Sequence, residues 1–139
     1  MHHAECPVII VPEEYSFPLS VVLAYDGSKA SVFAIKQFAY IFPELAQKST
    51  MIVYASAKED EIPDLAYITE LAARHYQDLS ICKLDANPKK YFNSWLMDKG
   101  DPLLVSGSFG RTFLSETFKK NFVEEVVSDH KLPVFIAHQ

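Results

Sequence analysis

The chain alternates short apolar runs with longer segments in which apolar residues recur every three or four positions. Short, near-continuous apolar runs are typical of strands that are covered on both faces of a sheet. The wider stripes are typical of helices that pack on such a sheet. We predict strands at five runs: Ser20–Tyr25, Thr50–Ala55, Leu79–Leu84, Leu103–Val105 and Pro133–Ala137.

Four helical segments are predicted between these strands. They span Lys29–Phe42, Pro63–His75, Pro88 to the residue before Gly100, and Leu114–Ser128. Capping residues and first-turn prolines mark several of the starts, and Ser28 is a good N-cap for the first helix. Strands that alternate with helices predict right-handed crossovers and a parallel sheet, so the fold class is α/β. In Leu79–Leu84 apolar and polar residues alternate, which favours an edge strand with one solvated face.

An additional strand is predicted near the start of the chain. Pro7–Val11 is a β-branched run that ends at a polar connector, Pro12-Glu-Glu. It matches Pro133–Ala137, because each run is a proline followed by four apolar residues. We interpret this match as a short internal repeat, in which residues 1–14 imitate the end of a domain and 15–139 form the domain itself. Chance similarity over five residues is the alternative.

Two loops carry the candidate binding chemistry. Asp26-Gly27-Ser28 follows the first strand of the domain, and Gly107 and Gly110 follow the fourth. In open α/β sheets, ligands bind beyond the carboxyl ends of the strands where the strand order reverses. A glycine loop that leads into a helix also presents backbone N–H groups to anions. A plain turn kept for folding is the alternative for Gly107 and Gly110.

Composition and charge narrow the class of protein. The chain has 139 residues, of which 49% are hydrophobic and 22% charged, values that argue for one folded domain and against disorder. The net charge of -5 counts against a nucleic-acid partner. Apolar runs stay below the roughly 18 residues that a membrane span needs, and the start lacks a signal-peptide pattern. We therefore expect no membrane partner, and a cytoplasmic protein whose Cys6 and Cys82 are reduced.

Catalytic and metal chemistry have little support in the sequence. None of the five histidines forms a spaced ligand pair with a cysteine, so no metal site is predicted. No serine lies in a nucleophile elbow, and no pair of carboxylates has a context that marks acid–base work. We expect a protein that is not an enzyme.

The order of these motifs resembles the universal stress protein family. Val22–Ser28 resembles the family's opening strand and Asp-Gly-Ser turn, and Leu104–Arg111 resembles its Gly-x-x-Gly loop. Val123–Val127 and Pro133-Val134 resemble its closing helix and strand, so the match covers roughly residues 17 to 139. His3–Val8 is similar to the sequence with which the family closes, so the chain also resembles the second half of a tandem member.

The resemblance implies a Rossmann-like fold. It implies a five-stranded parallel sheet of order 3-2-1-4-5 with helices on both faces, to which the N-terminal strand is added. It also implies a role in stress response, and dimers that form through the last strand. For this chain we expect a homodimer through Val134–Ala137 or through the N-terminal run Val8–Val11.

The resemblance also places an ATP site, at which this sequence departs from the family pattern. Members that bind ATP carry Gly-x-x-Gly, nine residues, and then Gly-Ser or Gly-Thr. Gly107 and Gly110 satisfy the first part, but Lys120 and Asn121 stand where the second glycine pair should be. A lysine side chain takes up space that phosphate oxygens need near the backbone, although its ammonium could partner a phosphate.

Four further positions complete the candidate cofactor site that the resemblance implies. They are Asp26, Gly27, Ala55 and Ser106. Asp26 has a simpler alternative role, which is to orient its own turn.

We therefore predict a regulatory or interaction module of the universal stress type in which ATP binding is lost or weakened. The first alternative is an adenine-nucleotide-binding protein with weak hydrolysis at most. The second is a structural half of a tandem pair, whose partner half holds the ligand.

Overall fold

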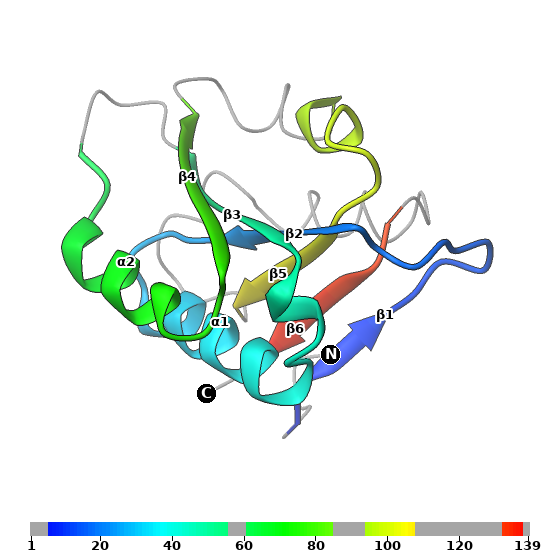
Figure 1. Ribbon diagram of the computed structural model, residues 1–139, viewed down its shortest axis with the longest axis horizontal. Helices are drawn as coiled ribbons and strands as arrows, with labels where there is room; N and C mark the ends of the chain where they lie inside the picture. The colour runs from blue at the N-terminus through cyan, green and yellow to red at the C-terminus, as the bar shows by residue number, and fades with distance from the viewer. Residues whose placement is uncertain (1–5, 56–60, 85–93, 108–131, 138–139) are drawn as a thin grey trace.

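The protein is built around one six-stranded sheet (Figure 1). The computed structural model describes residues 6–55, 61–84, 94–107 and 132–137. The strands are β1 (Val8–Ile10), β2 (Ser20–Ala24), β3 (Ser49–Ala55), β4 (Asp78–Leu84), β5 (Leu103–Gly107) and β6 (Val134–Ala137). The helices are α1 (Lys29–Ile41), α2 (Leu65–Ala73) and a 3₁₀ turn at Leu45–Gln47.

The strands lie in the order β1-β6-β5-β2-β3-β4. Strands β2 to β6 are parallel to one another, whereas β1 pairs with β6 in the antiparallel direction. When β1 is set aside and the strands are counted from Ser20, the order is 3-2-1-4-5. The α/β class, the mainly parallel sheet and the extra N-terminal strand are thus as the sequence predicted.

Each face of the sheet carries its own apolar cluster. Alternate residues of β2 point to opposite faces, so Leu23 belongs to one cluster and Val22 to the other. The first cluster is covered by α1 and α2, which lie below the sheet in Figure 1. The second is covered in part by a helical turn at 94–97, whose Leu96 is fully buried. The described helical segments therefore lie on both faces of the sheet.

Helix α1 begins where the sequence predicted. Ser28 is its N-cap, and the Ser28 hydroxyl accepts a hydrogen bond from the Ser31 backbone N–H at 3.1 Å. The helix ends at Ile41, one residue before the predicted boundary, because Pro43 cannot continue it.

Helix α2 is shorter than predicted. It spans Leu65–Ala73 rather than Pro63–His75. Asp64, which precedes it, has a left-handed backbone with φ of 49°, so Pro63 is separated from the helix. The prediction that Pro63 lies in the first turn of the helix was therefore wrong. The helix itself is present and begins two residues later, at Leu65.

Strand β4 lies at one end of the sheet, as the alternation of its residues predicted. Its side chains are mostly exposed or half-buried, and Ile81 is 37% exposed. The predicted helix from Pro88 is described only from residue 94, and the predicted helix at Leu114–Ser128 lies outside the described residues.

Strand β1 forms the other end of the sheet. Figure 1 shows β1 beside β6, with an arm that leads from it back to β2. Because β1 pairs with β6, the outer edge of β6 is already occupied. The expected homodimer through the last strand would therefore require β1 to leave.

Candidate functional site

Three parallel strands bring the candidate binding residues to one edge of the sheet. Strand β2 pairs with β3 on one side and with β5 on the other, and the strand order reverses between β2 and β5. The carboxyl ends of these strands carry Asp26 and Gly27, Ala55, and Ser106 and Gly107. The other predicted site residues, Gly110, Lys120 and Asn121, lie outside the described residues.

The Asp26 side chain is engaged in its own turn. The Ser28 backbone N–H donates to Asp26 Oδ1 at 2.9 Å, which is the geometry of an Asx turn. Gly27 follows with a φ of 80°, and an added Cβ would lie 2.9 Å from Pro63 Cβ. The carboxylate and the glycine therefore both have structural roles at the start of α1.

Gly107 allows β5 to approach the first turn of α1. An added Cβ would lie 2.6 Å from the Ala30 carbonyl carbon and 2.7 Å from the Ser31 nitrogen. Both are backbone atoms, which cannot swing aside as a side chain can. Close packing of strand on helix is sufficient to require glycine at this position.

Ser106 and Ala55 lie within strands rather than in loops. Ser106 is 4% exposed, and its hydroxyl donates to the carbonyl oxygen of Gly107 at 3.1 Å. Ala55 is the last residue of β3, and its register partner in β4 is Leu84. The structure thus places Ala55 at the same end of the sheet as Gly107, two strands away.

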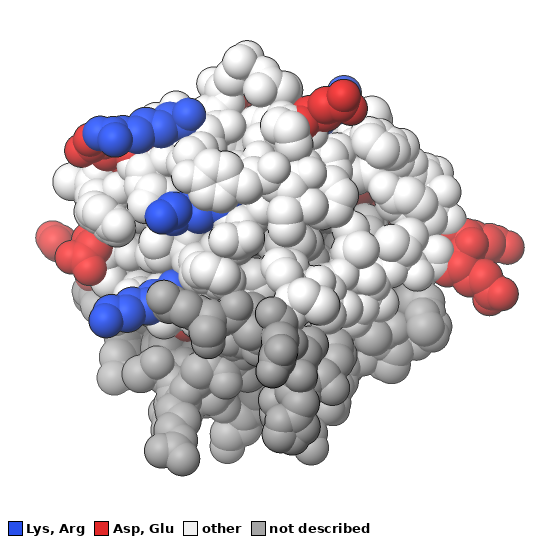
Figure 2. Space-filling view, turned by 90° about the horizontal axis from the view of Figure 1, so that it is seen from below, with Lys and Arg blue, Asp and Glu red and all other residues white. Residues whose placement is uncertain are grey.

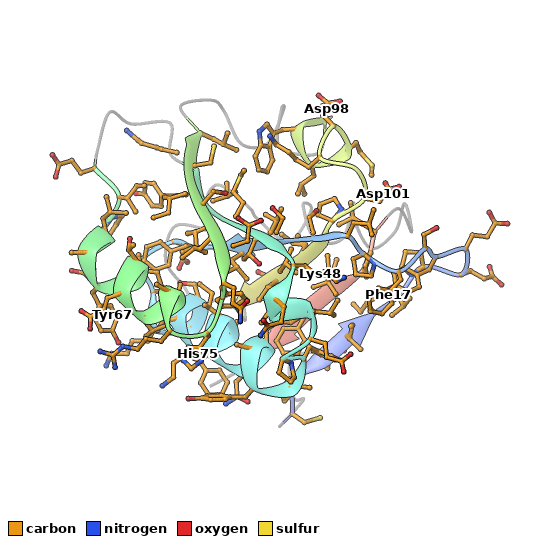
Figure 3. All side chains as sticks on the ribbon, viewed as in Figure 1. Phe17, Lys48, Tyr67, His75, Asp98 and Asp101 are labelled. Carbon is orange, nitrogen blue, oxygen red and sulfur yellow. The ribbon has the colours of Figure 1, made fainter. Side chains whose placement is uncertain are left out.

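A hollow of about 270 Å³ lies beside the Asp26–Gly27 turn, between α1 and α2. Its lining combines cationic, acidic, aromatic, aliphatic and small residues: Tyr25, Gly27, Ser28, Lys29, Val32, Phe33, Lys36, Asp64 and Tyr67. In Figure 3, Tyr67 lies on α2 at the outer side of the helix layer. Of these residues, the sequence-based site included only Gly27. The signal that could have identified the hollow is the spacing of Lys29, Val32, Phe33 and Lys36 on one helix face.

Tyr25 forms one wall of the hollow and is held by a hydrogen bond. Its hydroxyl donates to the Pro63 carbonyl oxygen at 2.8 Å. Burial raises the pKa of Tyr25, and the negative charges of Asp64 and Asp26 raise it further. Tyr25 therefore stays a neutral hydrogen-bond donor at physiological pH, with its oxygen fixed toward α2.

Further observations concern the metal-ligating side chains, the helices and the surface charges of the described residues. Among them, no group of three metal-ligating side chains comes together, and both Cys6 and Cys82 are free thiols. No helix in the described part of the chain is long and apolar enough to cross a membrane. Figure 2 shows the face below the sheet, where lysine and arginine side chains are scattered and do not form a continuous patch.

Together these features define a Rossmann-like α/β domain with a loop-bearing edge at the reversal of strand order. No protein-family model and no curated protein matches the chain. Solved structures do match, and they include two universal stress proteins. The chain therefore has the fold of the universal stress proteins, as its motifs indicated.

Three of the similar structures show the extent of this likeness. A universal stress protein in complex with cAMP is 23% identical, with a TM-score of 0.62, over 88% of this chain and 98% of its own. A universal stress protein from Archaeoglobus fulgidus is 19% identical, with a TM-score of 0.70 over 99% of this chain. Protein Rv1636 from Mycobacterium tuberculosis H37Rv is 20% identical, with a TM-score of 0.56, over 86% of this chain and 94% of its own.

The Archaeoglobus fulgidus protein differs from the other two in length. This chain spans 51% of it, so that protein is about twice as long as the part that matches. The match includes nearly all of this chain, and hence the region of β1.

Proposed function

We propose that this chain belongs to the universal stress proteins and acts as a regulatory or interaction module in stress response, with ATP binding lost or weakened. The observation that carries the proposal is the contact of Gly107 with α1. Backbone atoms of Ala30 and Ser31 lie within 2.7 Å of an added Cβ, so packing accounts for this glycine without a nucleotide. Asp26 likewise finds its partner in its own turn. Lys120 and Asn121, in place of a glycine pair, support the same conclusion.

The proposal includes the absence of enzymatic activity and a location in the cytoplasm. Neither the sequence nor the described site brings together a nucleophile and a general base. A test for activity is phosphate release from ATP under single-turnover conditions. We expect no release above that of a heat-denatured sample, and release of phosphate at a rate clearly above that sample would contradict the proposal.

Nucleotide content provides the main test. The protein is purified under native conditions and denatured, and the supernatant is chromatographed for adenine nucleotides. We expect less than one tenth of an equivalent per chain. A double variant, Lys120→Gly with Asn121→Ser, rebuilds the family pattern and should raise affinity for ATP by about ten-fold or more in calorimetry. A stoichiometric nucleotide in the unmodified protein would contradict the proposal.

Adenine-nucleotide binding is the second candidate function, and the hollow beside Gly27 favours it. Lys29 and Lys36 offer two ammonium groups for phosphates, and Tyr67 and Phe33 offer rings for a base. One of the structures with this fold is a complex with cAMP.

This second candidate has its own test. Lys36→Ala and Tyr67→Ala should each weaken binding of ATP or cAMP by about ten-fold, measured by calorimetry. Lys48→Ala is the matched control, because Lys48 lies outside the hollow, near the start of β3 (Figure 3). Equal affinities of all three variants would exclude the hollow as the binding site.

A further inference from the structure

Asp64 occupies the position that normally caps a helix, but its side chain does not cap α2. It precedes Leu65, the first residue of the helix, and its backbone is left-handed, with φ of 49° and ψ of 36°. A capping aspartate usually has an extended backbone, from which its carboxylate accepts a hydrogen bond from an N–H of the first turn. Asp64 makes no such hydrogen bond. Its carboxylate is therefore left for another partner.

This carboxylate lines the hollow between α1 and α2. Within the described ranges, no ion pair and no side-chain hydrogen bond involves it. Burial, and then the charge of Asp64, raise the pKa of Tyr25, so the charge lies close to the Tyr25 hydroxyl. That hydroxyl already donates its proton to the Pro63 carbonyl oxygen. The two oxygens of Asp64 therefore remain acceptors for a ligand in the hollow.

The rest of the lining supplies positive charge and aromatic rings. Lys29 and Lys36 lie on α1, two turns or about 10 Å apart along the helix axis, and neither has an ion pair among the described residues. Phe33 lies between them in the sequence. Tyr67 follows Asp64 by one turn of α2 and is labelled in Figure 3. A ligand that uses all of these groups has phosphates, a flat ring, and hydrogen-bond donors on the edge of that ring.

The two acceptor oxygens of a carboxylate distinguish one purine from the other. Guanine has two adjacent donors, the N1–H and the 2-amino group, which match the two oxygens. Adenine has one amino donor beside the lone pair of its own N1, and this lone pair repels the second carboxylate oxygen. A bidentate pair of this kind discriminates between bases by about 10- to 100-fold in affinity.

We propose that the hollow is a site for a free guanine nucleotide, in which Asp64 selects the base and Lys29 and Lys36 hold the phosphates. This inference rests on the second candidate function, nucleotide binding in the hollow, and changes the base that the hollow prefers. It is compatible with lost ATP binding at Gly107, because Gly107 does not line the hollow. The net charge of -5 favours a free nucleotide over a nucleic acid.

The first test is calorimetric titration of the full chain with GDP, inosine diphosphate and ADP. Inosine differs from guanosine only by the loss of the 2-amino group, so it removes one of the two donors. We expect GDP to bind most tightly, inosine diphosphate about 10-fold more weakly, and ADP about 100-fold more weakly.

Asp64→Asn should reverse the preference between the bases. The amide replaces one acceptor with a donor, and this pair matches the amino group and the N1 lone pair of adenine. Asparagine also adopts the left-handed backbone of this position. We expect GDP to bind about 100-fold more weakly to this variant and ADP about 10-fold more tightly.

Glu70→Gln is the matched control for Asp64→Asn. It makes the same chemical change on the same helix, but Glu70 pairs with Arg74 and does not line the hollow. It should leave both affinities unchanged. Circular dichroism checks that the variants are folded. If Asp64→Asn does not fold, the comparison of GDP with inosine diphosphate on the unmodified chain decides.

The outcomes separate this inference from the function on which it rests. Equal affinities for GDP and ADP would overturn the selection of guanine, while nucleotide binding in the hollow would stand. No binding of any nucleotide at about 1 mM would overturn both. A folded Asp64→Asn variant that still prefers GDP would overturn the role of Asp64. Tighter binding of a guanine-rich RNA oligonucleotide than of GDP would overturn the assignment to a free nucleotide.

Discussion

At the scale of single residues, two glycines that a motif would assign to a ligand have packing roles. Gly107 lies against the backbone of Ala30 and Ser31, and Gly27 combines a left-handed φ with the approach of Pro63. A glycine in a binding motif can thus be required by the fold alone. Its presence does not by itself distinguish a ligand site from a close contact between a strand and a helix.

Gly107→Ala tests this packing role. The added Cβ would clash with backbone, so we expect a loss of about 2–3 kcal/mol in the free energy of unfolding. Gly100→Ala is the control, because Gly100 has a φ of 76° but no atom within 4 Å of an added Cβ. It should cost about 1 kcal/mol from backbone strain alone. Urea denaturation measures both, and equal losses would contradict a packing role for Gly107.

At the scale of elements, α1 is joined to the segment between α2 and β4 by one buried tyrosine. The Tyr76 hydroxyl donates to the carbonyl oxygen of Ile35 at 2.7 Å, and the side chain is 2% exposed. On the outer surface the contact is an edge-on packing of the rings of Tyr40 and His75, 5.2 Å apart. His75 is labelled in Figure 3. The buried hydrogen bond of Tyr76 therefore holds α1 to the segment that connects α2 with β4.

This attachment predicts a dependence of stability on alkaline pH. Burial raises the pKa of Tyr76 above its ordinary value of 10.0, so the folded state holds the neutral form. The contribution is fully present below pH 10 and is lost as the pH rises above that value, where the unfolded chain ionises first.

Tyr76→Phe separates this effect from that of the other tyrosines. It should lower the free energy of unfolding at pH 7 by about 1 kcal/mol through the lost hydrogen bond. It should also reduce the fall in stability above pH 10, measured by urea denaturation across pH. Tyr40→Phe, on an exposed residue, is the control for the lost hydroxyl and should leave the free energy of unfolding at pH 7 unchanged. An unchanged alkaline slope in Tyr76→Phe would contradict the assignment.

At the scale of the whole molecule, three aromatic rings connect the first helix with the last strand. Phe38 packs on Phe42 at 5.4 Å and on Phe135 at 5.3 Å between ring centroids. Phe42 also contacts Phe135, at 6.0 Å. These ring contacts join α1 to β6, which are far apart in the sequence. They pack against the strand that pairs with β1.

A double-mutant cycle tests the coupling of α1 to β6. Phe38→Leu and Phe135→Leu should each destabilise the protein, and their combined loss should differ from the sum by about 1 kcal/mol. Phe38→Leu with Ile81→Ala is the control, because β4 lies at the other end of the sheet, and here the losses should add. Thermal and urea unfolding measure the cycle. Additivity for the Phe38–Phe135 pair would show that the ring contact carries no coupling.

The sequence by itself determined the elements whose signals are local. The buried run Val21–Ala24 predicted a strand, and the cap at Ser28 predicted a helix start. Pro7 and the apolar residues that follow it predicted β1. These signals are local, because side-chain periodicity and capping act within a few residues. The helix start predicted at Pro63 was wrong, because Asp64 has a left-handed backbone and the helix begins at Leu65.

Only the tertiary structure decided which distant groups meet. The contact of Gly107 with α1, the hollow beside Gly27 and the antiparallel pairing of β1 with β6 each join segments that are far apart in the chain. Local patterns specify which face of a strand or helix is apolar, but not which partner covers it. That choice depends on packing the whole sheet, and here it placed β1 antiparallel against the outer edge of β6.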